Sequence, residues 1–82
     1  MSDVKFPVFR KYSNERSFFK IESDRKFTER QLIGDKYTEF KIEATQYPEM
    51  LMIMELISLG QSHILASSAI EFESIADSRK SI

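Results

Sequence analysis

The stretch PEMLMIMELISL, residues 48–59, is the most apolar run in the chain and decides the fold that we expect. Four of its apolar residues follow the i, i+3, i+4, i+7 spacing of one helical stripe: Met50, Ile53, Met54 and Ile57. Thr45 can cap a helix, Pro48 suits a first turn and Gly60 is a typical stop signal. A buried strand is the rival interpretation, but the length and the excess of Met and Leu favour a core helix over residues 48–59.

The other side of this helix is apolar as well, and a helix with its back in water would not have that pattern. Its apolar members are Leu51, Met52, Leu56 and Leu59. We therefore expect a second cover, which is either a C-terminal helix of the same chain or another copy of the protein. In the second case these four residues form the predicted interface. A groove for a peptide is a further alternative, because Met-rich surfaces repack around varied partners.

The part of the chain before this helix, residues 4–44, is predicted to form four short strands joined by polar turns. The expected strands are residues 5–12, 17–23, 27–33 and 37–44. In the last strand we expect the even-numbered residues from Thr38 to Ala44 to face the core, and the odd-numbered ones from Glu39 to Glu43 to face water. Short connections join antiparallel neighbours, so the prediction is a four-stranded antiparallel meander.

A second, shorter helix is predicted at the C-terminal end of the chain, over residues 68–80. Ser68 and Glu71 fit a capping box, in which a Ser at the N-cap is followed three residues later by a Glu. The predicted fold class is therefore α+β: a four-stranded antiparallel meander, then a core helix and a shorter C-terminal helix. A chain of 82 residues is expected to form a single domain, residues 1–82.

Composition narrows the class of protein. The hydrophobic fraction of 41% and the charged fraction of 30% are typical of a soluble globular protein rather than a disordered one. The absence of Cys favours a reducing compartment, so we expect a cytoplasmic protein. No segment has the pattern of a signal peptide or the length of a membrane span, and no membrane partner is expected. The net charge of −1 lacks the strong basic bias of typical nucleic-acid binders.

Residues 10–37 carry a resemblance to other proteins. The segment RKYSN (residues 10–14) is followed by SFFKI (residues 17–21), and then by Phe27 and by QLIG (residues 31–34). This pattern resembles small uncharacterised bacterial proteins with an R-K-Y-S-N turn and an S-[YF]-F-K-I strand. The resemblance implies a bacterial, cytosolic origin. It transfers no function and no functional residues.

Residues that carry catalytic or metal chemistry are sparse. His63 is the only His, and it has no neighbouring pattern that matches a recognised nucleophile or metal site. Glu73 and Asp77 share a helix face, but hard cations usually need more ligands than two carboxylates. We expect a loop His and a solvated acidic face. The prediction is therefore a protein that is not an enzyme, with no catalytic residues, no metal and no cofactor.

Two functional hypotheses remain. The preferred one is a small non-enzymatic protein-interaction or regulatory module that forms a homodimer or binds a small protein partner. The alternative is single-stranded nucleic-acid binding on an aromatic and basic sheet face. The residues of that face would be Arg10, Tyr12, Phe18 and Lys20, with Arg30 and Lys41 nearby. Glu22, Glu39 and Glu43 would repel phosphate, so nucleic acid is the less favoured partner.

Overall fold

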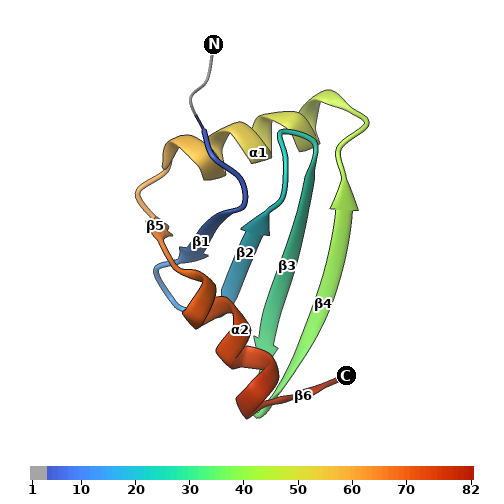
Figure 1. The fold of residues 1–82 in the computed structure, drawn as a ribbon, viewed down its shortest axis with the longest axis vertical. Coiled ribbons are helices and arrows are strands. Elements are labelled where there is room, and N and C mark those ends of the chain that lie inside the picture. Colours follow the sequence, from blue (N-terminus) through green and yellow to red (C-terminus); the bar gives the residue numbers. More distant parts are fainter. Residues whose placement is uncertain (1–3) are drawn as a thin grey trace.

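The computed structural model describes residues 4–82, which form a six-stranded sheet and two helices (Figure 1). In chain order the elements are β1 (Val8–Tyr12), β2 (Ser17–Ile21), β3 (Lys26–Ile33), β4 (Lys36–Glu43), α1 (Tyr47–Ser58), β5 (Ile64–Ala66), α2 (Ala69–Ser78) and β6 (Lys80–Ser81). The α+β class and the four consecutive antiparallel strands β1–β4 are confirmed. The predicted sheet is too small, because β5 and β6 add to it.

The two additional strands occupy opposite edges of the sheet, whose order is β5-β1-β2-β3-β4-β6. β5 pairs antiparallel with β1, whereas β6 pairs parallel with β4, so the sheet is mixed rather than purely antiparallel. β6 contacts β4 only at Lys36 and Tyr37. The Arg79 guanidinium, which precedes β6, donates to the carbonyl of Gly34 in the β3–β4 turn. Both short strands depend on contacts between distant parts of the chain, and local periodicity does not reveal such pairings.

Strand register divides the sheet into two faces, since directly opposite residues in neighbouring strands point to the same side. The first face, here called the α1 face, packs against α1. It includes Val8, Arg10, Tyr12, Phe19, Ile21, Phe27, Glu29, Thr38, Phe40 and Ile42. The second, here called the α2 face, includes Phe9, Lys11, Phe18, Lys20, Thr28, Arg30, Leu32, Tyr37, Glu39 and Lys41.

The main core lies between α1 and the α1 face. Its buried members are Phe19, Ile21, Phe27, Ala44, Ile53, Leu56 and Ile64. α1 runs across one end of the strands, so it covers the α1 face incompletely (Figure 1). Phe40, which we predicted to be a core residue, is consequently 43% exposed.

The predicted stripe of α1 is wrong at one position. Ile53 is buried as expected, but Met54 is 63% exposed and Leu56 takes the second buried place. Apolar residues surround most of this helix, so its periodicity does not specify which side is buried. Ile64 of β5 belongs to the same buried cluster as Leu56 and supplies apolar surface for it.

The ends of α1 also differ in detail from the prediction. Gln46, not Thr45, is the N-cap, and Glu49 accepts hydrogen bonds from the backbone N–H groups of both residues. At the other end Leu59 adopts a left-handed conformation with φ of 57°, and the Gly60 N–H donates to the Glu55 carbonyl at 2.9 Å. The helix therefore ends one residue before the predicted boundary.

α2 packs on the opposite side of the sheet from α1. Its buried residues Phe72 and Ile75 form a second cluster with Phe18 and Tyr37 of the α2 face. The N-cap is Ser68, as predicted, and its hydroxyl accepts from the Glu71 N–H at 3.2 Å. The Glu71 carboxylate accepts from the Ser67 hydroxyl and the Lys11 ammonium. The proposal that this helix covers the back of α1 is wrong. Its apolar side chains pack against the α2 face. The alternation in β4 had predicted that this face is exposed to water.

Replacing Ile53 by Asp is expected to unfold the protein. Ile53 is 1% exposed, and an unpaired buried charge costs about 3–5 kcal/mol, comparable with the whole stability of a small core. Met54→Asp is the matched control, because the neighbouring side chain is exposed. Thermal denaturation followed by circular dichroism should show a cooperative transition for the control only. A folded Ile53→Asp protein would show that α1 does not form the core.

Candidate interaction surfaces

The residues of the predicted nucleic-acid face lie on both sides of the sheet. Arg10 and Tyr12 belong to the α1 face, whereas Phe18 and Lys20 belong to the α2 face. Phe18 is also buried beside Phe72 of α2. The four residues therefore do not form one stacking surface. Their positions weaken the nucleic-acid hypothesis, because bases and phosphates of one strand must be contacted from a single face.

Arg10 has a structural task in this fold. Its guanidinium donates to the carbonyls of Leu56 and Ile57 in the last turn of α1, each at 2.9 Å, and to the carbonyl of Phe9 at 2.9 Å. The last carbonyls of a helix lack partners within the helix, so a cation there stabilises it. Partial burial lowers the pKa of Arg10 from its ordinary value. This side chain ties β1 to α1.

Tyr12, in the same strand as Arg10, packs against two other rings. Its ring lies 5.0 Å from the ring of Phe19 and 5.0 Å from the ring of His63, measured between centroids. Burial raises the pKa of Tyr12, and the carboxylates of Glu29 and Glu55 raise it further. His63 itself is exposed and packs against Tyr12 rather than against a nucleophile. Within residues 4–82, no three His, Cys, Asp or Glu side chains gather as metal ligands would.

Two cations of the α2 face, Arg30 and Lys11, are engaged within the chain. Arg30 lies 4.3 Å from the ring centroid of Phe72, and it donates to the Phe72 carbonyl at 2.8 Å and to Glu39 at 2.9 Å. Lys11 bridges Glu15 at 2.8 Å and Glu71 at 3.0 Å. Stacked and paired guanidinium and ammonium groups are less available for phosphate than free ones.

Lys20 and Lys41 flank Thr28 across three strands of the α2 face. They border a hollow of about 180 Å³, whose lining includes Glu22, Glu39 and Glu73 as well as these two lysines. The hollow carries both charge signs, so its field does not favour a polyanion. This observation agrees with the acidic side chains that disfavoured nucleic acid in the sequence.

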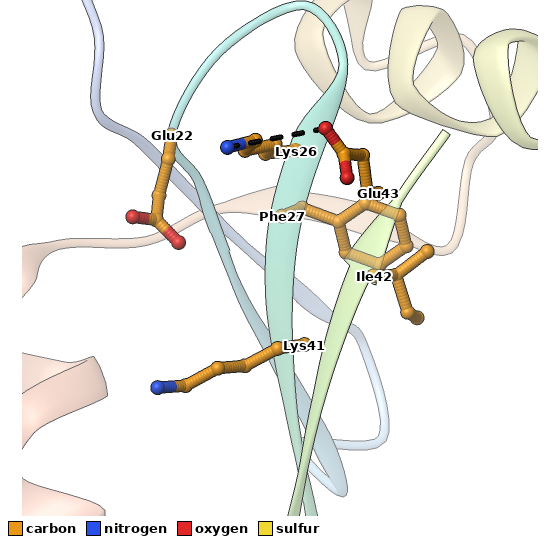
Figure 2. A pocket seen from close by; sticks show the side chains of 6 residues that line it. All are labelled: Glu22, Lys26, Phe27, Lys41, Ile42 and Glu43. Atoms are coloured by element: carbon orange, nitrogen blue, oxygen red, sulfur yellow. Dashed lines mark ion pairs between the residues drawn. The ribbon is translucent and has the colours of Figure 1, made fainter. Parts of the chain in front are cut away.

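A larger hollow of about 400 Å³ lies where β3 begins and β4 ends. It is lined by Glu22, Lys26, Phe27, Lys41, Ile42 and Glu43 (Figure 2). Lys26 and Glu43 form an ion pair of 3.9 Å, and the Lys41 side chain extends away from that pair in the same view. Phe27, which forms part of the wall, is 2% exposed and belongs to the core. The charged and apolar lining is typical of a contact surface near a sheet edge rather than of an enclosed ligand site.

The outer side of α1 leaves apolar side chains in solvent. Tyr47, Leu51 and Met54 are all exposed and follow i, i+4, i+7 spacing. Beside them is an apolar hollow of about 410 Å³, lined by Val4, Phe6, Asp24, Met54 and Ile57. Of the interface predicted from the sequence, Leu51 and Leu59 are exposed and Met52 is partly buried. Leu56 is 1% exposed, so it lies in the core and is not available to another chain.

The edge of β4 is the second candidate surface. β6 borders only Lys36 and Tyr37, and within residues 4–82 no strand pairs with the outer edge of residues 38–43 (Figure 1). The Tyr37 carbonyl accepts from Ile82 on the outer side, while the Ala44 N–H donates to the Arg25 carbonyl on the inner side. Backbone groups alternate along a strand, so those of residues 39, 41 and 43 also point outward.

Comparison with protein-family models, with curated proteins and with solved structures finds no match to this chain. No helix among residues 4–82 is long and apolar enough to cross a membrane.

Two features of these surfaces were not predicted from the sequence: the contact of Arg10 with α1 and the open edge of β4. The role of Arg10 had one signal, since a charged residue breaks the alternation of the first strand at that position. Its partners are separated from it by 46 and 47 residues, so they follow only from the fold. No pattern in the sequence indicates the open edge of β4, because the order of strands in a sheet is not a local property.

Arg10→Met should destabilise the protein by about 1.5–3 kcal/mol, since charged hydrogen bonds to two helix carbonyls are lost while the apolar stem is kept. Arg25→Met makes the same chemical change at an exposed turn and should be close to neutral. Urea denaturation measures both variants. Equal effects of the two substitutions would show that Arg10 does not stabilise the end of α1.

Glu71 is expected to make the stability of the protein depend on acid pH. Hydrogen bonds from the Ser67 hydroxyl, at 2.7 Å, and from the Lys11 ammonium, at 3.0 Å, lower the pKa of Glu71 below its ordinary value of 4.5. A lowered carboxyl pKa stabilises the folded state above the ordinary value, and the contribution is lost as pH falls through the folded-state pKa. The wild type should therefore melt above Glu71→Gln at neutral pH.

The difference in melting temperature between these two proteins should shrink as the pH is lowered below 4.5, the ordinary pKa of Glu71. Ser67→Ala removes the first of the two donors to Glu71. In a Ser67→Ala background, Glu71→Gln should therefore lower the melting temperature at neutral pH by less than it does in the wild type. A difference that stays constant across the acid range would contradict the assigned role of the carboxylate.

Proposed function

We propose that the protein is a small non-enzymatic interaction module that self-associates as a homodimer. The observation that carries the proposal is the open edge of β4, where residues 38–43 have no neighbouring strand among residues 4–82 and Phe40 is 43% exposed. An exposed strand edge is a ready template for pairing with another strand. Residues 38–43 therefore offer both unused backbone groups and apolar surface.

Size and symmetry favour a second copy as the partner. Small domains gain stability by pairing, because one core of this size supplies only a few kcal/mol. Two-fold dimers are also the commonest oligomers of soluble proteins. The absence of Cys and the resemblance of residues 10–37 support a bacterial cytoplasmic setting for this module.

Nucleic-acid binding has weaker support. On the α2 face, Lys20 and Lys41 are the cations without an ion pair among the described residues, and Glu22, Glu39 and Glu73 share their hollow. Arg30 also lines this hollow, so a polyanion would meet three positive and three negative side chains there. The interaction module is therefore the function that the geometry supports better.

Sedimentation velocity tests the proposal directly. Between about 1 and 100 μM, a range that brackets a micromolar dissociation constant, the sedimentation coefficient should rise from that of a monomer to that of a dimer. Association through a small interface is expected to be reversible within this range. A protein that remains a monomer at the highest concentration would contradict self-association.

A further inference from the structure

We infer that the open edge of β4 pairs antiparallel with the same edge of a second copy, about a two-fold axis at Phe40. The inference rests on the proposed self-association and specifies its surface and register. The resulting assembly is one continuous sheet through two copies of the protein, with both α1 helices on the same face of that sheet.

Backbone geometry permits this pairing. The N–H and C=O groups of Glu39 and Lys41 point away from β3, as the outward carbonyl of Tyr37 and the inward N–H of Ala44 require. An axis at Phe40 sets Glu39 opposite Lys41 of the second copy, and Lys41 opposite its Glu39. Each such pair exchanges both backbone hydrogen bonds, as in an ordinary antiparallel ladder.

Side chains in this register are complementary on both faces. On the α2 face, each Glu39 carboxylate meets a Lys41 ammonium from the other copy. On the α1 face, the exposed Phe40 rings meet each other, and Thr38 lies opposite Ile42. Opposite charges and aromatic pairs directly across two strands stabilise a sheet, and like charges there destabilise it.

Neighbouring registers are less favourable. An axis at Glu39 places the Glu39 side chains of the two copies opposite each other. An axis at Lys41 does the same for Lys41, and it also places Glu39 opposite Glu43. An axis at Ile42 keeps Lys41 opposite Glu43, but it pairs Glu39 with Thr45, beyond the last residue of β4. An axis between two residues, which shifts the register by one, is excluded. It would place the α1 face of one copy on the same side as the α2 face of the other.

Neighbouring elements set the length of the ladder. β6 borders β4 at Lys36 and Tyr37, so pairing begins at Thr38 and, by symmetry, ends at Ile42. This span is centred on Phe40. In Figure 1, β6 lies beside one end of β4 only and leaves the rest of that edge open.

The outer side of α1 is a poorer contact between copies. α1 contains Glu49 and Glu55 and no Lys or Arg, so stacking it on itself would bring acidic side chains together. The edge of β4 carries both signs in alternating order, Glu39, Lys41 and Glu43. Charge complementarity therefore favours the edge over the helix as the surface for a second copy.

A charge-exchange experiment tests the register. Lys41→Glu places Glu opposite Glu, and Glu39→Lys places Lys opposite Lys, so each variant should self-associate about tenfold more weakly than the wild type. Mixing the two variants restores Glu opposite Lys in both pairs. Native mass spectrometry of the mixture should therefore show more heterodimer than either homodimer.

Two controls accompany the mixture. Met54→Lys adds a charge to the exposed side of α1 and should leave association unchanged. Glu39→Lys also loses the ion pair with Arg30, so thermal denaturation must show that each variant is folded. The chain has no Cys, so Phe40→Cys provides a third measurement: it should form a disulfide-linked dimer on oxidation, and Ile42→Cys should not.

The outcomes separate the inference from the proposed function. A monomeric wild type overturns both. A dimeric wild type that Met54→Lys disrupts, with no effect of the β4 variants, overturns the edge pairing and leaves self-association in place. Weakening by Lys41→Glu but not by Glu39→Lys, with cross-linking at position 42, overturns the axis at Phe40.

Discussion

The packing of Ile53 and Leu56 against the α1 face of the sheet is the contact on which the rest of the structure depends. Both residues are 1% exposed, and they share one buried cluster with Phe19 and Ile21 of β2. Arg10 fastens the same helix from the strand side through the carbonyls of its last turn. Apolar burial therefore fixes where α1 lies, and charged hydrogen bonds from Arg10 stabilise its last turn.

The positions of the two helices explain why each face of the sheet is incompletely covered. The helix crosses one end of the strands, so Phe40 stays exposed on the α1 face (Figure 1). α2 covers part of the other face, where Arg30 stacks on Phe72 beside the buried Tyr37. A small chain divides its apolar side chains between two clusters, and neither helix is left to cover the other.

The same division determines which surfaces remain for partners. The outer side of α1 is apolar and acidic, whereas the β4 edge combines one exposed aromatic ring with alternating charges. The cations that suggested a phosphate-binding sheet are split between faces or engaged by carboxylates, helix carbonyls and aromatic rings. These arrangements support a protein-interaction module, and the unpaired edge is the surface whose chemistry best matches a second copy.

The sequence by itself determined the α+β class, strands β1–β4 and both helices. Alternation, turn residues, the Ser68 cap and the apolar run after Pro48 act over a few residues, and backbone geometry converts such patterns into elements. Only the tertiary structure decided which side of α1 is buried, that Tyr37 rather than Phe40 is covered, and which strand edge stays open. These outcomes depend on contacts between residues far apart in the chain, which no local period encodes.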